Sequence, residues 1–358
     1  MVYLPHWPKP YDSRSLEEGP NRVKQILNNL DNPQNKIPPA IHITGTNGKG
    51  STSSFCANIL KENGYKTHIY TSPHIHHTNE RIQLNNKIID DDFLYQILEQ
   101  VRIASININP SFFEAITCAA FLAFSQVKAD FCIIEVGMGA RIDATNIINN
   151  KIATIITSIS DDHGEFLGEN LTQIAFEKSF IMQQNAPCIS DSQDKNATQI
   201  LKLRAKEVKT TIKFLSEDFS FKINPDNSFD FISTAKTIRN IPKPNLIGRH
   251  QYHNATLAIK AILEADIPIK DNFLKQAMKS ISIHSRLQEV SNNLNKLLLN
   301  QNIKLYIDGA HNKGGSIIIA NWLKNQKYDK KYLICGFSKN KCQPDFFKPF
   351  KGIINFTA

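Results

Sequence analysis

The sequence lacks the features that mark exported, membrane-spanning and disulfide-stabilised proteins. Its first residues, Met1-Val-Tyr-Leu-Pro-His-Trp-Pro, contain no apolar stretch of the kind found in secretory signals. The longest apolar runs, such as Ala115 to Phe124, are too short to cross a bilayer. The six cysteines show no C-x-x-C or zinc-ligand spacing, which predicts reduced thiols in a protein core. We therefore expect a cytoplasmic protein that does not enter a membrane.

The sequence also lacks a dense run of Lys and Arg with interleaved aromatic residues, although its formal net charge is +9. Basic charge can favour nucleic acid or anionic substrates. Here the charge is spread along a chain that is also rich in Asn and Ile, so a compositional bias explains it more simply. With 358 residues the chain is long enough for two domains, each with its own core. We expect a monomer that binds small molecules and no nucleic acid.

The most informative stretch runs from Ile41 to Ser51, where a short apolar run precedes a glycine-containing loop and the start of a helix. Such a strand–loop–helix arrangement wraps backbone N–H groups around phosphates and directs a helix N-terminus at their charge. The usual P-loop pattern has a glycine at position 43 and a hydroxyl at position 50, where this chain has Ile43 and Gly50. The alternative is a glycine-rich turn without a ligand. We interpret the stretch as a nucleotide phosphate site made of Gly45, Thr46, Asn47, Gly48, Lys49, Gly50 and Ser51.

Apolar runs alternate with helical patterns, which predicts a mostly parallel sheet built from βαβ units. In such sheets ligands bind beyond the carboxyl ends of the strands, so the loops that start at 45, 72, 135 and 158 should share one crevice. A second alternating pattern begins near Arg286. The expected fold is α/β, with a P-loop ATPase-like domain over 1–283 and a smaller Rossmann-like domain over 284–358.

Three residues near the expected crevice each allow two interpretations. Glu135 ends an apolar strand, where it could hold Mg²⁺ or pair with a lysine at the edge of the core. His163 follows two aspartates in the next strand-end loop, and a histidine in such a place is more often solvated than a metal ligand. Lys178 lies inside a predicted helix over 170–183, where a single lysine is ordinarily a solvated surface charge. These residues alone leave the alternatives open.

Several motifs occur together, in order, along nearly the whole chain. They are Ile-Thr-Gly-Thr-Asn-Gly-Lys-Gly-Ser (43–51), Thr-Ser-Pro-His-Ile (71–75), Glu-Arg-Ile (80–82), Glu-Val-Gly-Met-Gly-Ala-Arg-Ile-Asp-Ala-Thr-Asn (135–146), Asp-His (162–163), Phe-Leu-Gly (166–168), Ile-Ala-Phe-Glu-Lys (174–178) and Asp-Gly-Ala-His-Asn (308–312). The sequence thereby resembles the folylpolyglutamate synthase/dihydrofolate synthase family within the Mur ligase superfamily. The segment 135–146 is the most specific part, because the superfamily shares the phosphate loop more widely.

The resemblance implies an ATP-dependent amide ligase that joins L-glutamate to dihydropteroate, to reduced folates, or to both, through an acyl phosphate. It implies two Mg²⁺ ions, the first held by Ser51 and Glu135 and the second by Glu135, His163 and a carbamylated Lys178. Carbamylation would turn the lysine cation into an oxygen-donor anion suited to Mg²⁺. The residues implied to act in catalysis are Lys49, Lys178, His163 and Arg286.

The same resemblance assigns the remaining site residues. Those implied to contact the nucleotide outside the phosphate loop are Asn254 near the adenine, Arg286 on the phosphates, Asp308 on the ribose, and His311. Those implied to contact the pterin substrate are Pro73, Arg81, Phe113, Asp143 and Ala144. A carboxylate such as Asp143 can accept two N–H bonds from an aminopyrimidine edge.

Two other functions stay open at this point. A cell-wall or cyanophycin-type Mur ligase would need a UDP-binding domain, for which the stretch before the phosphate loop leaves no room. Family members usually continue beyond the segment that matches Gly336 to Lys341, which predicts a shortened second domain that ends in one apolar strand over 352–358. A small domain of that size is marginally stable, so the alternative is a non-catalytic remnant that binds only nucleotide.

Overall fold

The structure is a computed structural model that describes residues 16–160, 168, 170–291, 303–337 and 344–357. Its centre is an eight-stranded sheet in the order β4-β3-β2-β5-β1-β6-β7-β8. Strands β2, β5, β1, β6, β7 and β8 run parallel, whereas β3 and β4 form an antiparallel hairpin at one edge. The strands are β1 (Ala40–Thr44), β2 (Thr67–Tyr70), β3 (Ile82–Leu84), β4 (Lys87–Ile88), β5 (Phe131–Glu135), β6 (Lys151–Ile156), β7 (Cys188–Ser190) and β8 (Ile212–Phe214).

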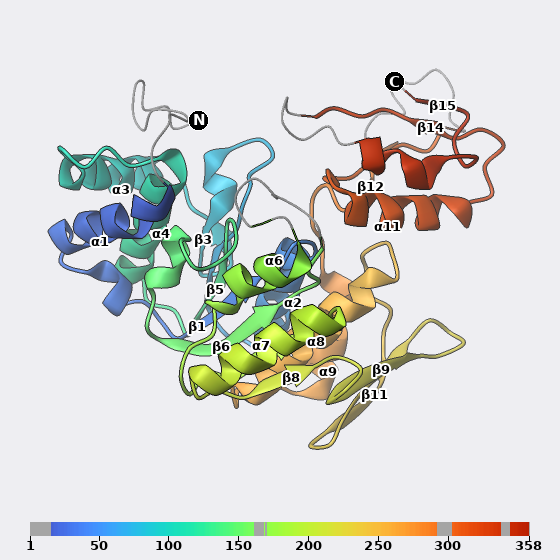
Figure 1. Cartoon of the computed structure of the whole chain (residues 1–358), viewed down its shortest axis with the longest axis horizontal. Coiled ribbons are helices and arrows are strands. Elements are labelled where there is room, and N and C mark those ends of the chain that lie inside the picture. Colours follow the sequence, from blue (N-terminus) through green and yellow to red (C-terminus); the bar gives the residue numbers. More distant parts are fainter. Residues whose placement is uncertain (1–15, 161–167, 169, 292–302, 338–343, 358) are drawn as a thin grey trace.

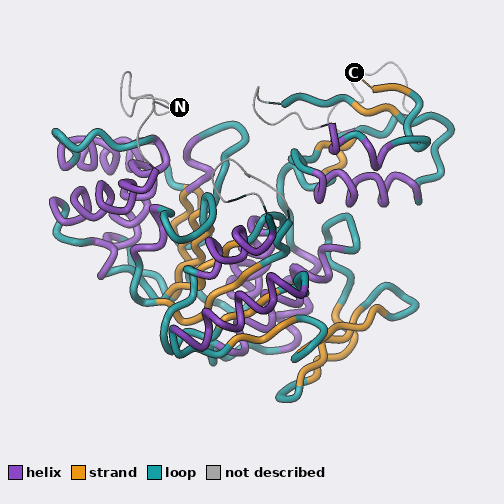
Figure 2. Tube along the Cα trace, viewed as in Figure 1, coloured by secondary structure: helices purple, strands orange, loops and turns teal. Residues whose placement is uncertain are grey.

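Helices cover both faces of this sheet (Figures 1 and 2). Helices α1 (Gly19–Asn29), α3 (Asp91–Ala104) and α4 (Phe112–Gln126) pack together on one side, where Tyr70 and Ile134 of the sheet join their core. Helices α2 (Lys49–Glu62), α8 (His250–Glu264) and α9 (Asp271–Ser280) pack on the other side. Helices α6 (Leu171–Ser179) and α7 (Lys195–Glu207) pack against each other beside β7.

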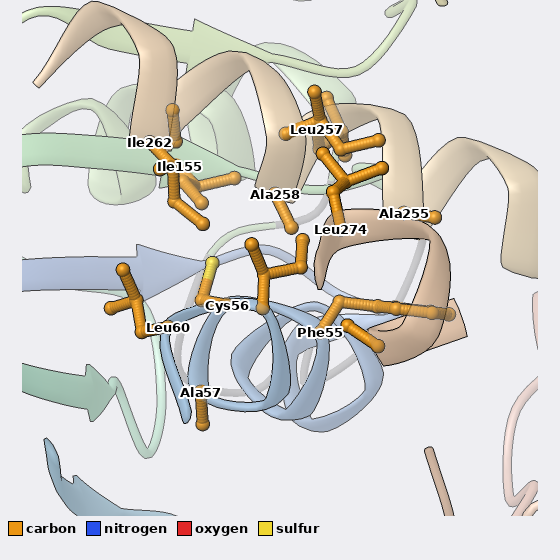
Figure 3. Packing of buried hydrophobic residues seen from close by; sticks show 14 of the residues in the cluster. Phe55, Cys56, Ala57, Leu60, Ile155, Ala255, Leu257, Ala258, Ile262 and Leu274 are labelled. Carbon is orange, nitrogen blue, oxygen red and sulfur yellow. The ribbon is translucent and has the colours of Figure 1, made fainter. Parts of the chain in front are cut away.

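The core between α2, α8 and α9 fixes the helix that follows the glycine loop. Phe55, Cys56 and Leu60 of α2 lie against Ala258 of α8 and Leu274 of α9, all of them fully buried (Figure 3). Removing a buried Leu or Phe side chain from such a core costs about 2–5 kcal/mol. Burial of apolar side chains further along the helix therefore fixes the position of the α2 N-terminus.

A three-stranded antiparallel sheet, in the order β11-β10-β9, extends from the main body. Its strands are β9 (Phe219–Ile223), β10 (Phe229–Ser233) and β11 (Thr237–Ile241). Phe229 and Phe231 of β10 alternate inward and are fully buried, while the residues between them are more accessible. The short irregular strands predicted for 211–245 are thus confirmed.

The C-terminal part forms a smaller unit with its own apolar cluster around Phe346 and Phe350. It contains β12 (Gln288–Glu289) paired antiparallel with β13 (Tyr306–Ile307), helix α11 (Lys313–Lys324), and β14 (Tyr332–Leu333) paired parallel with β15 (Phe356–Thr357). The predicted α/β fold, with a large mostly parallel sheet and a smaller second sheet unit, is confirmed. Among the described helices, none is long and apolar enough to cross a membrane.

Three local predictions were wrong. The segment 72–82, predicted as a loop, contains a 3₁₀ helix (Thr78–Arg81) and leads into the β3–β4 hairpin. Its turn residues Asn85 and Asn86 both have positive φ, which suits the twist of a two-residue hairpin turn. The predicted terminal strand over 352–358 is reduced to Phe356–Thr357.

The third wrong boundary concerns the helix predicted over 170–183, which ends at Ser179. The carbonyl oxygen of Phe180 accepts a hydrogen bond from the side chain of Asn146, and that of Ile181 accepts one from Lys151. The N–H groups of Ile181 and Met182 donate only three residues back, to Lys178 and Ser179, so the α-helical pattern stops there, and the tertiary donors satisfy carbonyl groups that have no partner within the helix. The helix end is therefore set by contacts that periodicity does not reveal.

Candidate functional site

The glycine loop is shaped by Gly45 and by the loop that follows β6. Gly45 has φ +144°, and a Cβ atom there would lie 1.8 Å from Thr157 Oγ1, so no larger residue fits. Thr46 N donates to the carbonyl oxygen of Ser158 at 2.8 Å, and its hydroxyl donates to that of Ser160 at 3.0 Å. These hydrogen bonds join the loop after β1 to the loop after β6, two of the loops that were expected to share one crevice.

Two lysines converge on this loop. Lys49, the first residue of α2, donates to the carbonyl oxygens of Gly45 at 3.0 Å and Thr46 at 3.2 Å. Lys178, on α6, is only 3% exposed and donates to the same Gly45 oxygen at 2.9 Å. The position of Lys178 excludes the solvated surface charge that its helix pattern alone would favour.

Glu135 lies at the end of β5, next to the glycine loop, and is 3% exposed. Burial raises the pKa of its carboxyl group to about 6, although the positive charges of Lys49 and Arg286 act in the opposite direction. One oxygen accepts a long hydrogen bond, 3.4 Å, from Ser72 N. A Cβ atom on Gly50 would lie 3.6 Å from this oxygen. It would lie at the same distance from Arg286 Nη2, so both groups border Gly50.

This arrangement suits a divalent cation. Glu135 supplies a desolvated carboxylate with little hydrogen bonding of its own, and Mg²⁺ prefers oxygen ligands of this kind. Ser51, the third residue of α2, is 2% exposed and follows Gly50 directly. In the described part of the chain, no group of three or more His, Cys, Asp and Glu residues could hold a metal by itself. The fourth predicted metal ligand, His163, lies outside the described residues.

The C-terminal unit also reaches the loop. Asn312 caps α11 and donates through Nδ2 to Asn47 Oδ1 at 3.1 Å. The backbone carbonyl of Ser285 accepts a 3.2 Å hydrogen bond from Arg286 Nη1. The guanidinium lies so close to Gly309 that a Cβ atom there would be 2.7 Å from Nη1. Arg286 is therefore held between the two units of the chain, beside Glu135 and Gly50.

The other residues predicted to bind the nucleotide lie in the C-terminal unit and on α8. Asp308 accepts hydrogen bonds from Leu287 N at 2.8 Å and Ala310 N at 2.7 Å, and burial raises the pKa of its carboxyl group. His311 follows with Nδ1 3.1 Å from the carbonyl oxygen of Gly309. Asn254, on α8, contacts the loop itself, because a Cβ atom on Gly48 would lie 2.6 Å from its Oδ1 atom.

The residues predicted for the pterin end lie around the β5–β6 connection and the loop after β2. Asp143 accepts hydrogen bonds from Met138 N at 3.0 Å and from Thr145, and its pKa is raised by burial. The ring of Phe113 closes over Gly137, where a Cβ atom would lie 2.4 Å away. Ala144 is buried next to Asp143, and Pro73 follows Ser72, the residue that contacts Glu135.

Arg81 contacts the loop after β2 and the start of α4. Its Nε donates to His74 Nδ1 at 2.8 Å, and its guanidinium lies 5.1 Å from the ring centre of Phe112. The side chain is 8% exposed, and its charge is close enough to Glu135 to lower the pKa of that carboxyl group. It therefore belongs to the same edge of the sheet as the glycine loop.

Sequence reasoning missed the polar residues of β1 as parts of this site. His42 Nε2 lies 2.9 Å from Thr145 Oγ1, and Thr44 Oγ1 donates to the carbonyl oxygen of Gly139 at 2.6 Å. The available signal was a histidine and a threonine at alternate positions in a strand buried along its full length.

Comparison with known proteins agrees with this geometry. The family model for the Mur ligase middle domain matches residues 43–262. The chain is 32% identical over 344 residues to the dihydrofolate synthase/folylpolyglutamate synthase of Bacillus subtilis, covering 92% of this chain and 77% of that protein. The crystal structure of folylpolyglutamate synthase from Thermotoga maritima superposes with a TM-score of 0.80 at 28% identity, covering 94% of this chain and 78% of that one. A complex of a folylpolyglutamate synthase with AMPPCP and folate gives a TM-score of 0.86 at 26% identity, covering 96% and 85%. The chain belongs to the folylpolyglutamate synthase/dihydrofolate synthase family of Mur ligases.

Proposed function

We propose that the protein is an ATP-dependent ligase that joins L-glutamate to dihydropteroate, to a reduced folate, or to both. The observation that carries the proposal is the convergence of Lys49, Lys178 and Glu135 on one glycine loop at the carboxyl edge of the sheet. Family membership supports the ligase class, and a related synthase has been solved with AMPPCP and folate bound.

In the proposed reaction the substrate carboxylate attacks the γ-phosphate of ATP, the bond to the bridging oxygen breaks, ADP leaves, and an acyl phosphate forms. The amine of L-glutamate then attacks the acyl carbon, an amide bond forms, and inorganic phosphate leaves. The loop Gly45 to Ser51 would bind the phosphates through its backbone N–H groups. Lys49 and Arg286 would neutralise the charge that develops on the transferring phosphoryl group. Lys49 donates to the carbonyl oxygens of Gly45 and Thr46, which keeps its ammonium next to the loop.

Ser51 and Glu135 would hold a first Mg²⁺, and Glu135, His163 and Lys178 a second. Bound there, Mg²⁺ would supply positive charge to the phosphate oxygens. An ammonium cannot ligate a cation, so Lys178 fits this role only after its amine adds CO₂ and releases a proton to give a carbamate. Its burial and its 2.9 Å contact with Gly45 place the amine beside the phosphate loop, where that modification would be useful.

The proposed substrate contacts follow the described geometry. Asn254 and Asp308 would bind the nucleoside, with His311 next to Asp308 in the same loop. The pterin would lie between Phe113 and Asp143, with Pro73 and Ala144 completing the pocket. Arg81 would face the acidic part of the substrate.

The test is an ADP-release assay on the full chain with dihydropteroate, or a reduced folate, plus L-glutamate and ATP. We expect ADP release that depends on both the pterin substrate and glutamate. Nucleotide binding measured by titration, together with no such ADP release for either pterin substrate, would establish a protein that binds nucleotide without ligating and would overturn the proposal.

A further inference from the structure

One face of the central strand β1 carries polar side chains where apolar ones would be expected. Strands in the middle of a covered parallel sheet are usually apolar on both faces. Ile41 and Ile43 follow that rule and join the core with α2. His42 and Thr44 lie on the opposite face, are fully buried, and both contact the connection between β5 and β6. A buried polar group costs free energy unless it is hydrogen-bonded, so the partners of these two side chains account for their presence.

The direction of the hydrogen bonds from His42 can be assigned. The hydroxyl of Thr145 donates to Asp143 Oδ1 at 2.5 Å, and Thr145 N donates to the same oxygen at 2.9 Å. A hydroxyl has one proton to donate, so the 2.9 Å contact between His42 and Thr145 must be a donation from Nε2–H. His42 Nδ1 is then the unprotonated nitrogen, and it has no hydrogen-bond partner among the described residues.

The protonation state of His42 agrees with this assignment. Burial lowers its pKa well below the ordinary value, and the neighbouring charge of Lys151 lowers it further. The imidazole is therefore neutral near pH 7 and has a single N–H to donate. The chain of donors runs from His42 to Thr145 to Asp143, and Met138 N holds the other oxygen of Asp143.

We propose that His42 is a positioning residue for pterin recognition, which acts by orienting Thr145 and through it the carboxylate of Asp143. The inference rests on the proposed function, because it assumes that Asp143 accepts N–H bonds from the pterin. Each carboxylate oxygen has a limited set of lone-pair directions. The hydrogen bonds from Thr145 fix the plane of the Asp143 carboxylate, and the orientation of that plane decides which lone-pair directions face the substrate. His42 itself does not touch the substrate in this arrangement.

The experiment compares His42→Leu, which removes the donor, with His42→Gln, whose side-chain amide can still donate to Thr145. We expect His42→Leu to raise the KM for dihydropteroate roughly tenfold, the effect of losing a hydrogen bond that supports a charged group. The KM for ATP and kcat should change little. His42→Gln should recover most of the loss. Equilibrium binding of dihydropteroate, followed by its fluorescence, should show the same order of affinities without any turnover.

The matched control is His68→Leu. His68 is also fully buried in the parallel sheet, on β2, but its ring contacts Val127 and Asn85 instead of the β5–β6 connection. We expect this variant to lose stability without a change in the KM for dihydropteroate. If His42→Leu behaves like His68→Leu, with a lower Tm and an unchanged KM, the inference is wrong.

A second pair of variants covers the case in which His42→Leu does not fold. Thr145→Val removes the hydroxyl, and Thr145→Ser keeps it. We expect weaker dihydropteroate binding only for the valine variant, and equal binding by the two would overturn the inference. A wild-type protein that neither binds dihydropteroate nor ligates would overturn the proposed function, and the inference with it. A wild-type protein that ligates normally while every variant keeps its KM would overturn the inference alone.

Discussion

Lys49 and Lys178 donate to one shared acceptor, the carbonyl oxygen of Gly45, at 3.0 and 2.9 Å. Two ammonium groups on one oxygen repel each other, and the burial of Lys178 weakens the screening of this repulsion by solvent. A carbamate on Lys178 would replace this repulsion with an attraction between opposite charges. This shared contact is therefore a reason to examine the chemical state of Lys178 directly.

Lys178→Ala should be inactive, and short carboxylates such as formate or acetate should restore part of the activity by replacing the carbamate oxygens. Lys202→Ala is the matched control, since Lys202 lies on the adjacent helix α7 and forms a surface ion pair with Glu217. Mass spectrometry of the native protein in bicarbonate should detect the carbamate. An unmodified lysine, together with an active Lys178→Ala variant, would show that Lys178 has no role in metal binding.

Lys49→Ala should lower kcat by roughly a hundred- to a thousandfold, because losing a cation at a developing phosphoryl charge costs about 3–4 kcal/mol. Thermal unfolding should change little, since the core of α2 lies further along the helix at Phe55 and Leu60. Lys61→Ala, an exposed lysine in the last turn of the same helix, is the control. Turnover close to that of the wild type would mean that the loop does not bind the transferring phosphate.

Gly314→Ala should weaken ATP binding without lowering the stability of the protein. Gly314 lies in the first turn of α11, where alanine is favoured over glycine by about 1 kcal/mol. An added Cβ would lie only 2.7 Å from Asn47 Nδ2 and 3.2 Å from Ser160 Oγ, which would displace the Asn47 side chain and disturb its hydrogen bond with Asn312 of the C-terminal unit. We expect a weaker apparent affinity for ATP without a loss in Tm. Gly336→Ala, where nothing lies within 4 Å of the added atom, should leave ATP affinity unchanged. Equal ATP affinities for the two variants would contradict a closed contact at Asn47.

Lys151 should give the protein a rising stability between pH 7 and about 8.5. Burial lowers the pKa of Lys151 to about 7, whereas a lysine in the unfolded chain has a pKa of about 10.4. Between these values the unfolded chain binds more protons than the folded one, so the free energy of unfolding rises by up to about 1.4 kcal/mol per pH unit. The cost of burying the charged amine is present in full below pH 7 and is relieved as the pH rises.

Urea unfolding of wild type and Lys151→Met at several pH values measures this slope. The titratable groups nearest to Lys151 act outside the chosen window, because the pKa of His42 is lowered well below its ordinary value and that of Cys188 is raised to about 12. We expect Lys151→Met to flatten the slope. Lys128→Met, at an exposed lysine, should keep it. Parallel slopes for wild type and Lys151→Met would show that Lys151 keeps an ordinary pKa in the folded protein.

The elements that sequence alone predicted well have strong local signals. The sequence predicts a helix over 250–264, and α8 has these bounds. Gly64 predicts that the helix after the glycine loop stops at about Asn63, and α2 ends at Glu62 with Asn63 as its cap. The sequence predicts strands over 304–308 and 331–336, but β13 and β14 are each only two residues long. An apolar run favours an extended chain but does not show where a pairing partner is present.

The site was predictable where one motif contained it and unpredictable where the fold joined distant segments. The glycine loop was predicted from its own residues. The contact between Lys178 and Gly45 joins residues 133 positions apart, so no local pattern could give it. His42 was passed over because a single histidine in an apolar strand is usually a core residue, and its partner Thr145 lies on another connection of the sheet.

The close approach of Gly48 to Asn254 has a consequence for mutational scanning of this chain. Gly48 has φ +90°, and any larger residue there would collide with Asn254 Oδ1. Asn254 belongs to α8, where its Oδ1 atom accepts a hydrogen bond from Thr52 Oγ1 of α2 and its Nδ2 atom donates to Gln251. A substitution at this loop position would therefore push the Asn254 side chain out of these hydrogen bonds and would also strain the backbone at a positive φ. A scan that selects for folded protein alone should score position 48 as intolerant, although its glycine has no side chain to bury.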